Sequence, residues 1–122
     1  MEKSKKERIE KLSEKTKNLN LDNELYIFVN NIKWGKKANI LINCVDLGTN
    51  IEFYFSVFFS NKYFSRSGDF NFREYMENSF ENNRILAVKF KRSKTGYLNC
   101  FNARIAEVSD LSKISARKLL LL

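Results

Sequence analysis

The sequence predicts a mainly β protein with helices, built as a five-stranded Greek-key barrel with the chain order β-β-β-α-β-β and an added helix at each end. Three strand-like segments precede one amphipathic helix, and two strand-like segments follow it. The 122 residues are therefore divided into a polar N-terminal helix or arm (1–23), the barrel (24–108) and a C-terminal helix (109–122).

The first three strands are predicted over residues 24–31, 38–46 and 51–60. The third is the clearest, because its residues alternate in character at the period of two that a half-buried strand shows. The residues predicted to face the core are Ile51, Phe53, Phe55, Val57 and Phe59, and those predicted to face outward are Glu52, Tyr54, Ser56 and Phe58.

The helix is predicted over residues 70–80, where four apolar residues recur at helical spacing. Asn71 and Glu74 form a capping-box pair at its start, and Phe70 with Tyr75 forms a hydrophobic staple around the cap. The apolar stripe consists of Phe72, Tyr75, Met76 and Phe80.

The last two strands are predicted over residues 84–91 and 97–108, joined by a turn at 92–96. In the first of them Leu86, Val88 and Phe90 face inward, whereas Ala87, Lys89 and Lys91 face outward. In the second, the alternation changes phase between residues 100 and 103, which predicts a β-bulge or a strong bend.

Both terminal segments read as helices. Residues 4–17 are polar with a thin apolar seam, which is typical either of a frayed, solvated helix or arm or of a weak coiled coil. At the other end, Ser109 or Asp110 caps a helix that finishes in four leucines. These leucines are expected to pack on the barrel or on a second copy of the chain.

Composition argues against several classes of function. The chain has no histidine, and its two cysteines, Cys44 and Cys100, stand alone in separate strands, so we expect no metal site and no cofactor. Both thiols are expected to be buried and reduced. No apolar run is long enough to cross a membrane and no secretory signal is recognisable, which predicts a cytoplasmic protein without a membrane partner.

Positive charge is unevenly placed along the chain. There are 22 basic and 14 acidic residues, for a formal net charge of +8. Residues 84–104 hold six basic residues and no acid, whereas residues 69–81 hold four acids and one arginine. The barrel is therefore expected to have one positive side and one negative, helix-bearing side, a layout that orients a polyanion.

A resemblance to a known fold family rests on the first half of the barrel. The first strand runs into the segment Ile-Lys-Trp-Gly-Lys-Lys (32–37), and the second ends in the turn Leu47-Gly48-Thr49 before an aromatic third strand. With a helix between the third and fourth strands, this order resembles the OB-fold, especially its members that bind single-stranded nucleic acid. The resemblance covers roughly residues 24–108.

The resemblance implies a ligand site. In OB-folds the ligand crosses the second and third strands, between the loop that joins strands one and two and the loop that joins strands four and five. Both loops are basic in this chain and contain no acid. Their cations would contact phosphates, and outward rings would stack on bases. The residues implied are Lys33, Trp34, Lys36, Lys37, Tyr54, Phe58, Lys62, Arg66, Lys89, Lys91, Arg92 and Lys94, none of them catalytic.

The expected function is non-catalytic, mostly sequence-tolerant binding of single-stranded DNA or RNA, accessory to replication, recombination or a mobile element. One alternative is a protein-interaction module or small inhibitor that binds an acidic protein surface and uses residues 109–122 to dock or to form a homo-oligomer. An enzyme is disfavoured, because the chain has no phosphate-binding glycine loop and Ala87 stands where a metal-dependent nuclease needs an acid.

Overall fold

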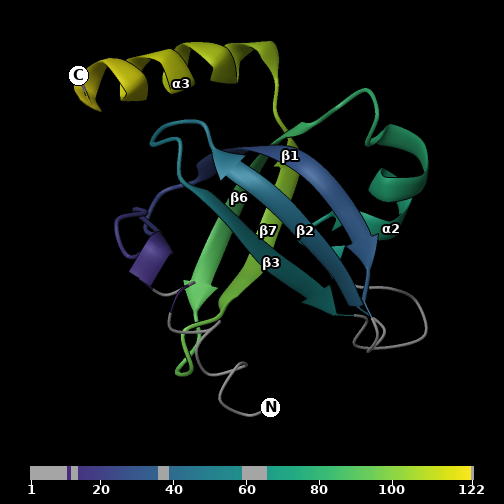
Figure 1. Ribbon diagram of the computed structural model, residues 1–122. Coiled ribbons are helices and arrows are strands. Elements are labelled where there is room, and N and C mark those ends of the chain that lie inside the picture. The colour runs from purple at the N-terminus through teal and green to yellow at the C-terminus, as the bar shows by residue number, and fades with distance from the viewer. Residues whose placement is uncertain (1–10, 12–13, 36–38, 59–65, 122) are drawn as a thin grey trace.

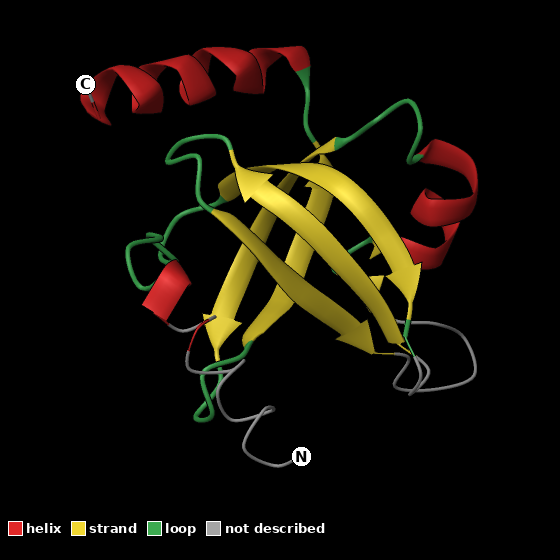
Figure 2. Ribbon diagram, viewed as in Figure 1, coloured by secondary structure: helices red, strands yellow, loops and turns green. Residues whose placement is uncertain are grey.

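A five-stranded antiparallel sheet forms the body of the protein, with a two-stranded hairpin and a few short helices around it (Figures 1 and 2). The computed structural model describes residues 11, 14–35, 39–58 and 66–121, with backbone only at 66 and 116–121. The elements are β1 (Leu25–Trp34), β2 (Asn39–Asp46), β3 (Glu52–Phe58), β4 (Arg66–Ser67), β5 (Phe70–Asn71), α2 (Phe72–Glu74), the π-helix η1 (Tyr75–Ser79), β6 (Ile85–Arg92), β7 (Leu98–Ile105) and α3 (Val108–Leu121).

The sheet has the strand order β3-β2-β1-β6-β7, so β1 pairs with both β2 and β6. A bulge at Asn30 bends β1, and only the half before the bulge pairs with β6. The predicted closure into a barrel is not confirmed, because the sheet does not pair β3 with β7 in the described residues. The β4–β5 hairpin instead packs against β7, where the Ser67 hydroxyl lies 3.7 Å from the Cys100 sulfur.

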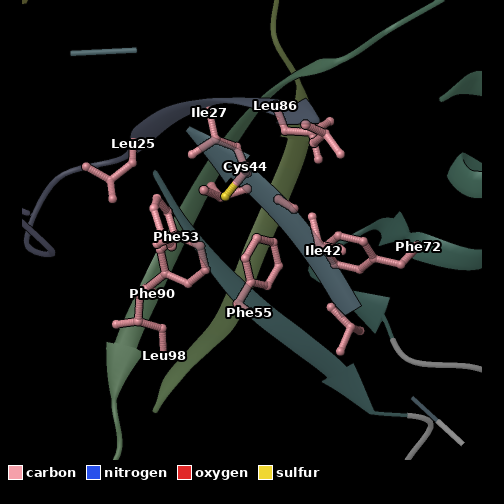
Figure 3. Packing of buried hydrophobic residues seen from close by; sticks show 14 of the residues in the cluster. Leu25, Ile27, Ile42, Cys44, Phe53, Phe55, Phe72, Leu86, Phe90 and Leu98 are labelled. Carbon is pink, nitrogen blue, oxygen red and sulfur yellow. The ribbon is translucent and has the colours of Figure 1, made fainter. Parts of the chain in front are cut away.

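The core lies between the inner faces of the two halves of the sheet (Figure 3). The Phe55 ring of β3 meets the Phe90 ring of β6 edge to face at 4.9 Å between centroids, and Phe53 meets the same ring at 5.8 Å. Phe72 closes the cluster from α2, at 6.4 Å from Phe55. The predicted alternation of β3 is confirmed over its described residues, since Phe53, Phe55 and Val57 are buried.

The helical segment begins at Phe72 rather than at the predicted residue 70, because Phe70 and Asn71 form β5, but its cap is the predicted one. The Asn71 side chain accepts a hydrogen bond from the Glu74 amide at 3.1 Å, and the Phe70 and Tyr75 rings lie 5.2 Å apart. From Tyr75 the helix widens, with the Phe80 amide bonded to the Tyr75 carbonyl at 2.8 Å. This wide turn and the β4–β5 hairpin were not predicted from the sequence.

The end of the N-terminal segment is anchored to the sheet. Leu19 is buried in the core cluster, and Thr16 has no exposed surface. Arg92 at the end of β6 donates to the Thr16 hydroxyl and to the Thr16 carbonyl, each at 3.0 Å. Thr16 and Leu19 are therefore packed parts of the fold, although the residues around them are exposed.

The C-terminal helix α3 covers the outer face where β1 pairs with β6. Its Ile114 is buried against Tyr26 and Ala87, which are paired across the two strands, so Ala87 is covered although it faces outward. Arg104 of β7 donates to both carboxylate oxygens of Glu24, at 3.2 and 2.8 Å, and to both of Asp110, at 2.8 and 3.0 Å. The start of α3 is thereby tied to β7 and to the start of β1.

The cap of α3 also differs slightly from the prediction. The Asp110 carboxylate accepts the Glu107 amide at 2.7 Å, so Glu107 holds the cap position and Asp110 lies within the first turn. Strand β7 ends at Ile105, earlier than the predicted residue 108. The predicted strand included Ala106, Glu107 and Val108, which instead lead into the helix or begin it.

Replacing Phe55 and Phe58 singly by alanine tests the two faces of β3. Phe55→Ala is expected to lower the free energy of unfolding by about 3 to 5 kcal/mol, because it opens a cavity among three packed rings. Phe58→Ala is expected to change it by less than about 0.5 kcal/mol, because this ring is exposed. Urea denaturation measures both, and equal losses would contradict the assignment of faces.

Stability in acid is expected to depend on Asp110. Hydrogen bonds from Arg104 and from the Glu107 amide hold the pKa of this carboxyl well below its usual range. The unfolded value is about 3.9, so the stabilisation is complete above about pH 5 and declines as the pH falls below it. Urea denaturation between neutral and acidic pH should show a stability gap between wild type and Asp110→Asn that narrows on acidification. Glu52→Gln, at an exposed carboxylate, is the control, and a gap that is constant with pH would contradict the assignment.

Candidate functional site

The turn between β2 and β3 sets the register of the surface on which the sequence places a ligand. Its Asp46 carboxylate accepts hydrogen bonds from the Thr49 amide at 2.9 Å and from the Thr49 hydroxyl at 2.6 Å. Asn50 adopts a φ of 62°, a left-handed conformation that asparagine tolerates. In the resulting register Tyr54 lies opposite Asn43, and residues opposite each other in a ladder share one face.

We call this surface the β1–β3 outer face. Three rings lie on it: Phe28 and Tyr54, which are half-buried, and Phe58, which is 55% exposed. Asn43 donates to the Asn31 side-chain carbonyl at 2.7 Å, which links β2 to β1 across the same face. The register assigns to this face Phe28, Asn31, Lys33, Asn39, Leu41, Asn43, Val45, Glu52, Tyr54, Ser56 and Phe58.

Trp34 does not share this face. It pairs with Ile40, whose own partner is Val57, and both of these residues are buried in the core. Trp34 is nevertheless 58% exposed, because it is the last residue of β1 and lies at the end of the sheet. Lys33, one residue earlier, points to the outer face. The two residues were predicted to lie together in a loop, but both belong to β1 and their side chains point to opposite faces of the sheet.

A second surface, the β6–β7 outer face, lies on the other half of the sheet. In Figure 1, β2 and β3 pass in front of β6 and β7, and the contact of Phe55 with Phe90 shows that the inner faces meet. The two outer faces therefore point in opposite directions. Between the part covered by α3 and the turn at 93–96, the second face consists of Lys89, Lys91, Asn99, Phe101 and Asn102.

Phe101 is a ring of this second face that the sequence analysis did not single out. Lys89 pairs with Asn102 and Phe90 pairs with Cys100, so Phe101 is the extra residue of a bulge. The bulge itself was predicted and is confirmed. The Lys91 ammonium lies 5.9 Å from the centroid of the Phe101 ring, which is 49% exposed. The change of phase in the alternation was the available signal, because a bulge turns an inward position outward.

The basic residues around this surface differ in what they bind. Arg92 is held by Thr16 and also points toward the Gly96 carbonyl at 3.5 Å. Lys89, Lys91 and Lys94 form no ion pair with any carboxylate in the described part of the chain. The three lysines are thus the cations that remain for a ligand.

Four of the predicted ligand contacts cannot be placed as side chains. Lys36, Lys37 and Lys62 lie outside the described residues, and Arg66 is described only as backbone in β4. The structure brings together Lys33, Tyr54 and Phe58 on one face, and Lys89 and Lys91 on the other.

The described residues offer little for covalent or metal chemistry. They contain no group of three His, Cys, Asp or Glu residues able to hold a metal ion. Burial raises the pKa of the Cys100 thiol to about 11 and that of the Cys44 thiol further, so both are protonated at neutral pH. Nor does the described chain contain a helix long and apolar enough to cross a membrane.

No family model matches this chain, and no match was found among curated proteins or among solved structures. A functional proposal therefore rests on the chemistry of the two outer faces.

Neighbouring cations of the β6–β7 turn are expected to respond differently to neutralisation. Arg92→Gln should lower the free energy of unfolding by about 1.5 to 3 kcal/mol, because the buried Thr16 loses charged hydrogen-bond donors. Lys94→Gln should change it by less than about 0.5 kcal/mol, since this lysine is exposed. Urea denaturation compares the two, and an unaffected Arg92→Gln would show that the anchor to Thr16 contributes nothing to stability.

Proposed function

We propose that this protein is a non-catalytic binder of single-stranded nucleic acid that uses the β1–β3 outer face with little regard to sequence. The observation that carries the proposal is the shared face of Lys33 on β1 and of Tyr54 and Phe58 on β3, with β2 between the two strands. Lys33 has no ion pair in the described part of the chain, so its charge is available for a phosphate. A single strand that crosses such a face can stack its bases on the rings and contact the cation with its backbone.

The strand order supports an OB-like architecture for this function. The OB-fold is a five-stranded, partly open Greek-key barrel that binds oligonucleotides across strands two and three. Here β1 pairs with both β2 and β6, β2 with β3, and β6 with β7, while β3 and β7 contact each other without a ladder. In Figure 1 the end of β1 and the β6–β7 turn lie on either side of β3. A ligand on β2 and β3 would therefore run between them.

Affinity would come from two additive sources. Each stacked base contributes about 1 to 3 kcal/mol and favours no sequence, because every base has an aromatic face. Each phosphate neutralised by a lysine releases counterions, which makes binding weaken with salt. The Asn31–Asn43 pair beside Tyr54 offers amide groups for a base edge or sugar hydroxyl, which is where a modest preference would arise.

A protein-interaction module is the second candidate, and one observation favours it. Val108 and Leu111 of α3 are 84% and 49% exposed, which places two apolar side chains on the outside of this helix. Their spacing of three residues puts them on one side of the helix. Removal of the whole segment 109–122 would uncover Tyr26 and Ala87, so point substitutions are the better probes of this alternative.

Binding of a labelled oligothymidylate of about 30 nucleotides, longer than one usual site, tests the proposal by fluorescence anisotropy at low salt. Phe58→Ala and Tyr54→Ala are each expected to weaken binding by about 5- to 150-fold through the loss of one stacking ring. Lys33→Gln should lower the slope of log affinity against log salt by about 0.7.

Leu111→Ala, an exposed apolar residue on α3, is the matched control and should bind as wild type. Duplex of the same length should bind more weakly than the single strand. Equal affinity of all variants would show that the β1–β3 outer face is not the binding site. No binding by wild type would favour the protein-partner alternative.

A further inference from the structure

We infer that the β6–β7 outer face, around Phe101, is a second contact site for the same single strand, on the opposite side of the molecule from Tyr54 and Phe58. This inference rests on the proposed function and extends it from one face to two. It predicts that a bound strand passes the β6–β7 turn and continues on β6 and β7.

The geometry of Phe101 carries the first step. In a regular strand, the residue after the inward-facing Cys100 would have a partner on β6. The bulge instead leaves Phe101 without a partner in the ladder. Because Lys91 faces outward and its ammonium lies over the Phe101 ring, the ring is also on the outer side. An exposed aromatic ring in contact with a cation is the combination that binds a base and its phosphate.

Charge gives the second step and identifies the occupant. Lys89 and Lys91 are two residues apart on one strand, so they lie on the same face about 7 Å from each other along it. Lys94 continues this row into the turn. No carboxylate occurs between residues 85 and 105, and the carboxylates of Glu24 and Asp110, which lie beside β7, are bound to Arg104. A row of lysines without counter-charges is complementary to a polyanion.

A purely structural role for the Lys91–Phe101 contact explains fewer of these features than a binding role does. A cation over a ring is worth about 0.5 to 1 kcal/mol at an exposed site, so the Lys91–Phe101 contact could serve folding. That role requires neither Lys89 nor Lys94, and it does not account for Asn99, which is exposed and faces outward two residues before Phe101. A base stacked on Phe101 would have the Asn99 amide within the same face.

Amide chemical shifts of the full-length protein, titrated with unlabelled oligothymidylate, distinguish the two faces directly. Shifts at residues 89–94 and 99–102, beside those on β2 and β3, are expected. In anisotropy measurements on the long strand, Phe101→Ala should weaken binding by about 5- to 150-fold, and Phe101→Trp should retain it. Lys91→Gln should reduce the salt slope by about 0.7, whereas Lys113→Gln, which removes the same charge from α3, should not.

The outcomes separate this inference from the proposed function. Shifts confined to β2 and β3, with Phe101→Ala binding as wild type, would overturn the second site and leave the first. Shifts confined to β6 and β7, with Phe58→Ala unaffected, would keep the second site and overturn the first. Weakening by Phe101→Ala that Phe101→Trp fails to restore would mean that stacking is not its role, and no shifts at all would overturn both.

Discussion

The packing of Phe55 and Phe53 of β3 on the Phe90 ring of β6 holds the two halves of the sheet face to face. Because residues alternate along a strand, each inward side chain determines the direction of its neighbours. With Phe53, Phe55 and Val57 committed to the core, Tyr54 and Phe58 must face outward. The same contact on β6 sends Lys89 and Lys91 to the opposite surface, so the core decides what each outer face presents.

Two bulges interrupt the strict alternation of inward and outward residues along the strands. The bulge at Asn30 bends β1, which lets a single strand pair with β2 beyond the bend and with β6 before it. The bulge at Phe101 lies in β7, between residues that pair with Lys89 and Phe90. It keeps Cys100 against the core and places Phe101 and Asn102 together outside. A local irregularity of one residue thus produces an exposed ring on a strand that otherwise alternates.

Features set by neighbouring residues were the ones that could be predicted from the sequence: the alternation of β3, the Asn71 cap, the Phe70–Tyr75 staple and the bulge in β7. Features set by distant residues were not predicted. The bond from Arg92 to Thr16 spans a separation of 76 residues, and Arg104 reaches Glu24 across 80. Local pattern also failed for Trp34, because the basic segment after it resembles a loop while pairing with Ile40 keeps it in β1. At the candidate site, outward rings followed from periodicity, but their division between two faces required the fold.

The six basic residues between 84 and 104 divide by chemistry into two sets. The three arginines are all engaged within the fold: Arg84 with Glu81, the Asn30 carbonyl and the Phe80 ring, Arg92 with Thr16, and Arg104 with Glu24 and Asp110. A planar guanidinium suits such contacts, since its several N–H groups can donate to more than one acceptor at once. The three lysines have no carboxylate partner among the described residues. Counting charge along the sequence therefore overstates how many side chains are open to a ligand: among these six, Lys89, Lys91 and Lys94 have no carboxylate partner in the described chain, whereas Arg92 keeps its charge but holds its donors on Thr16 and Gly96.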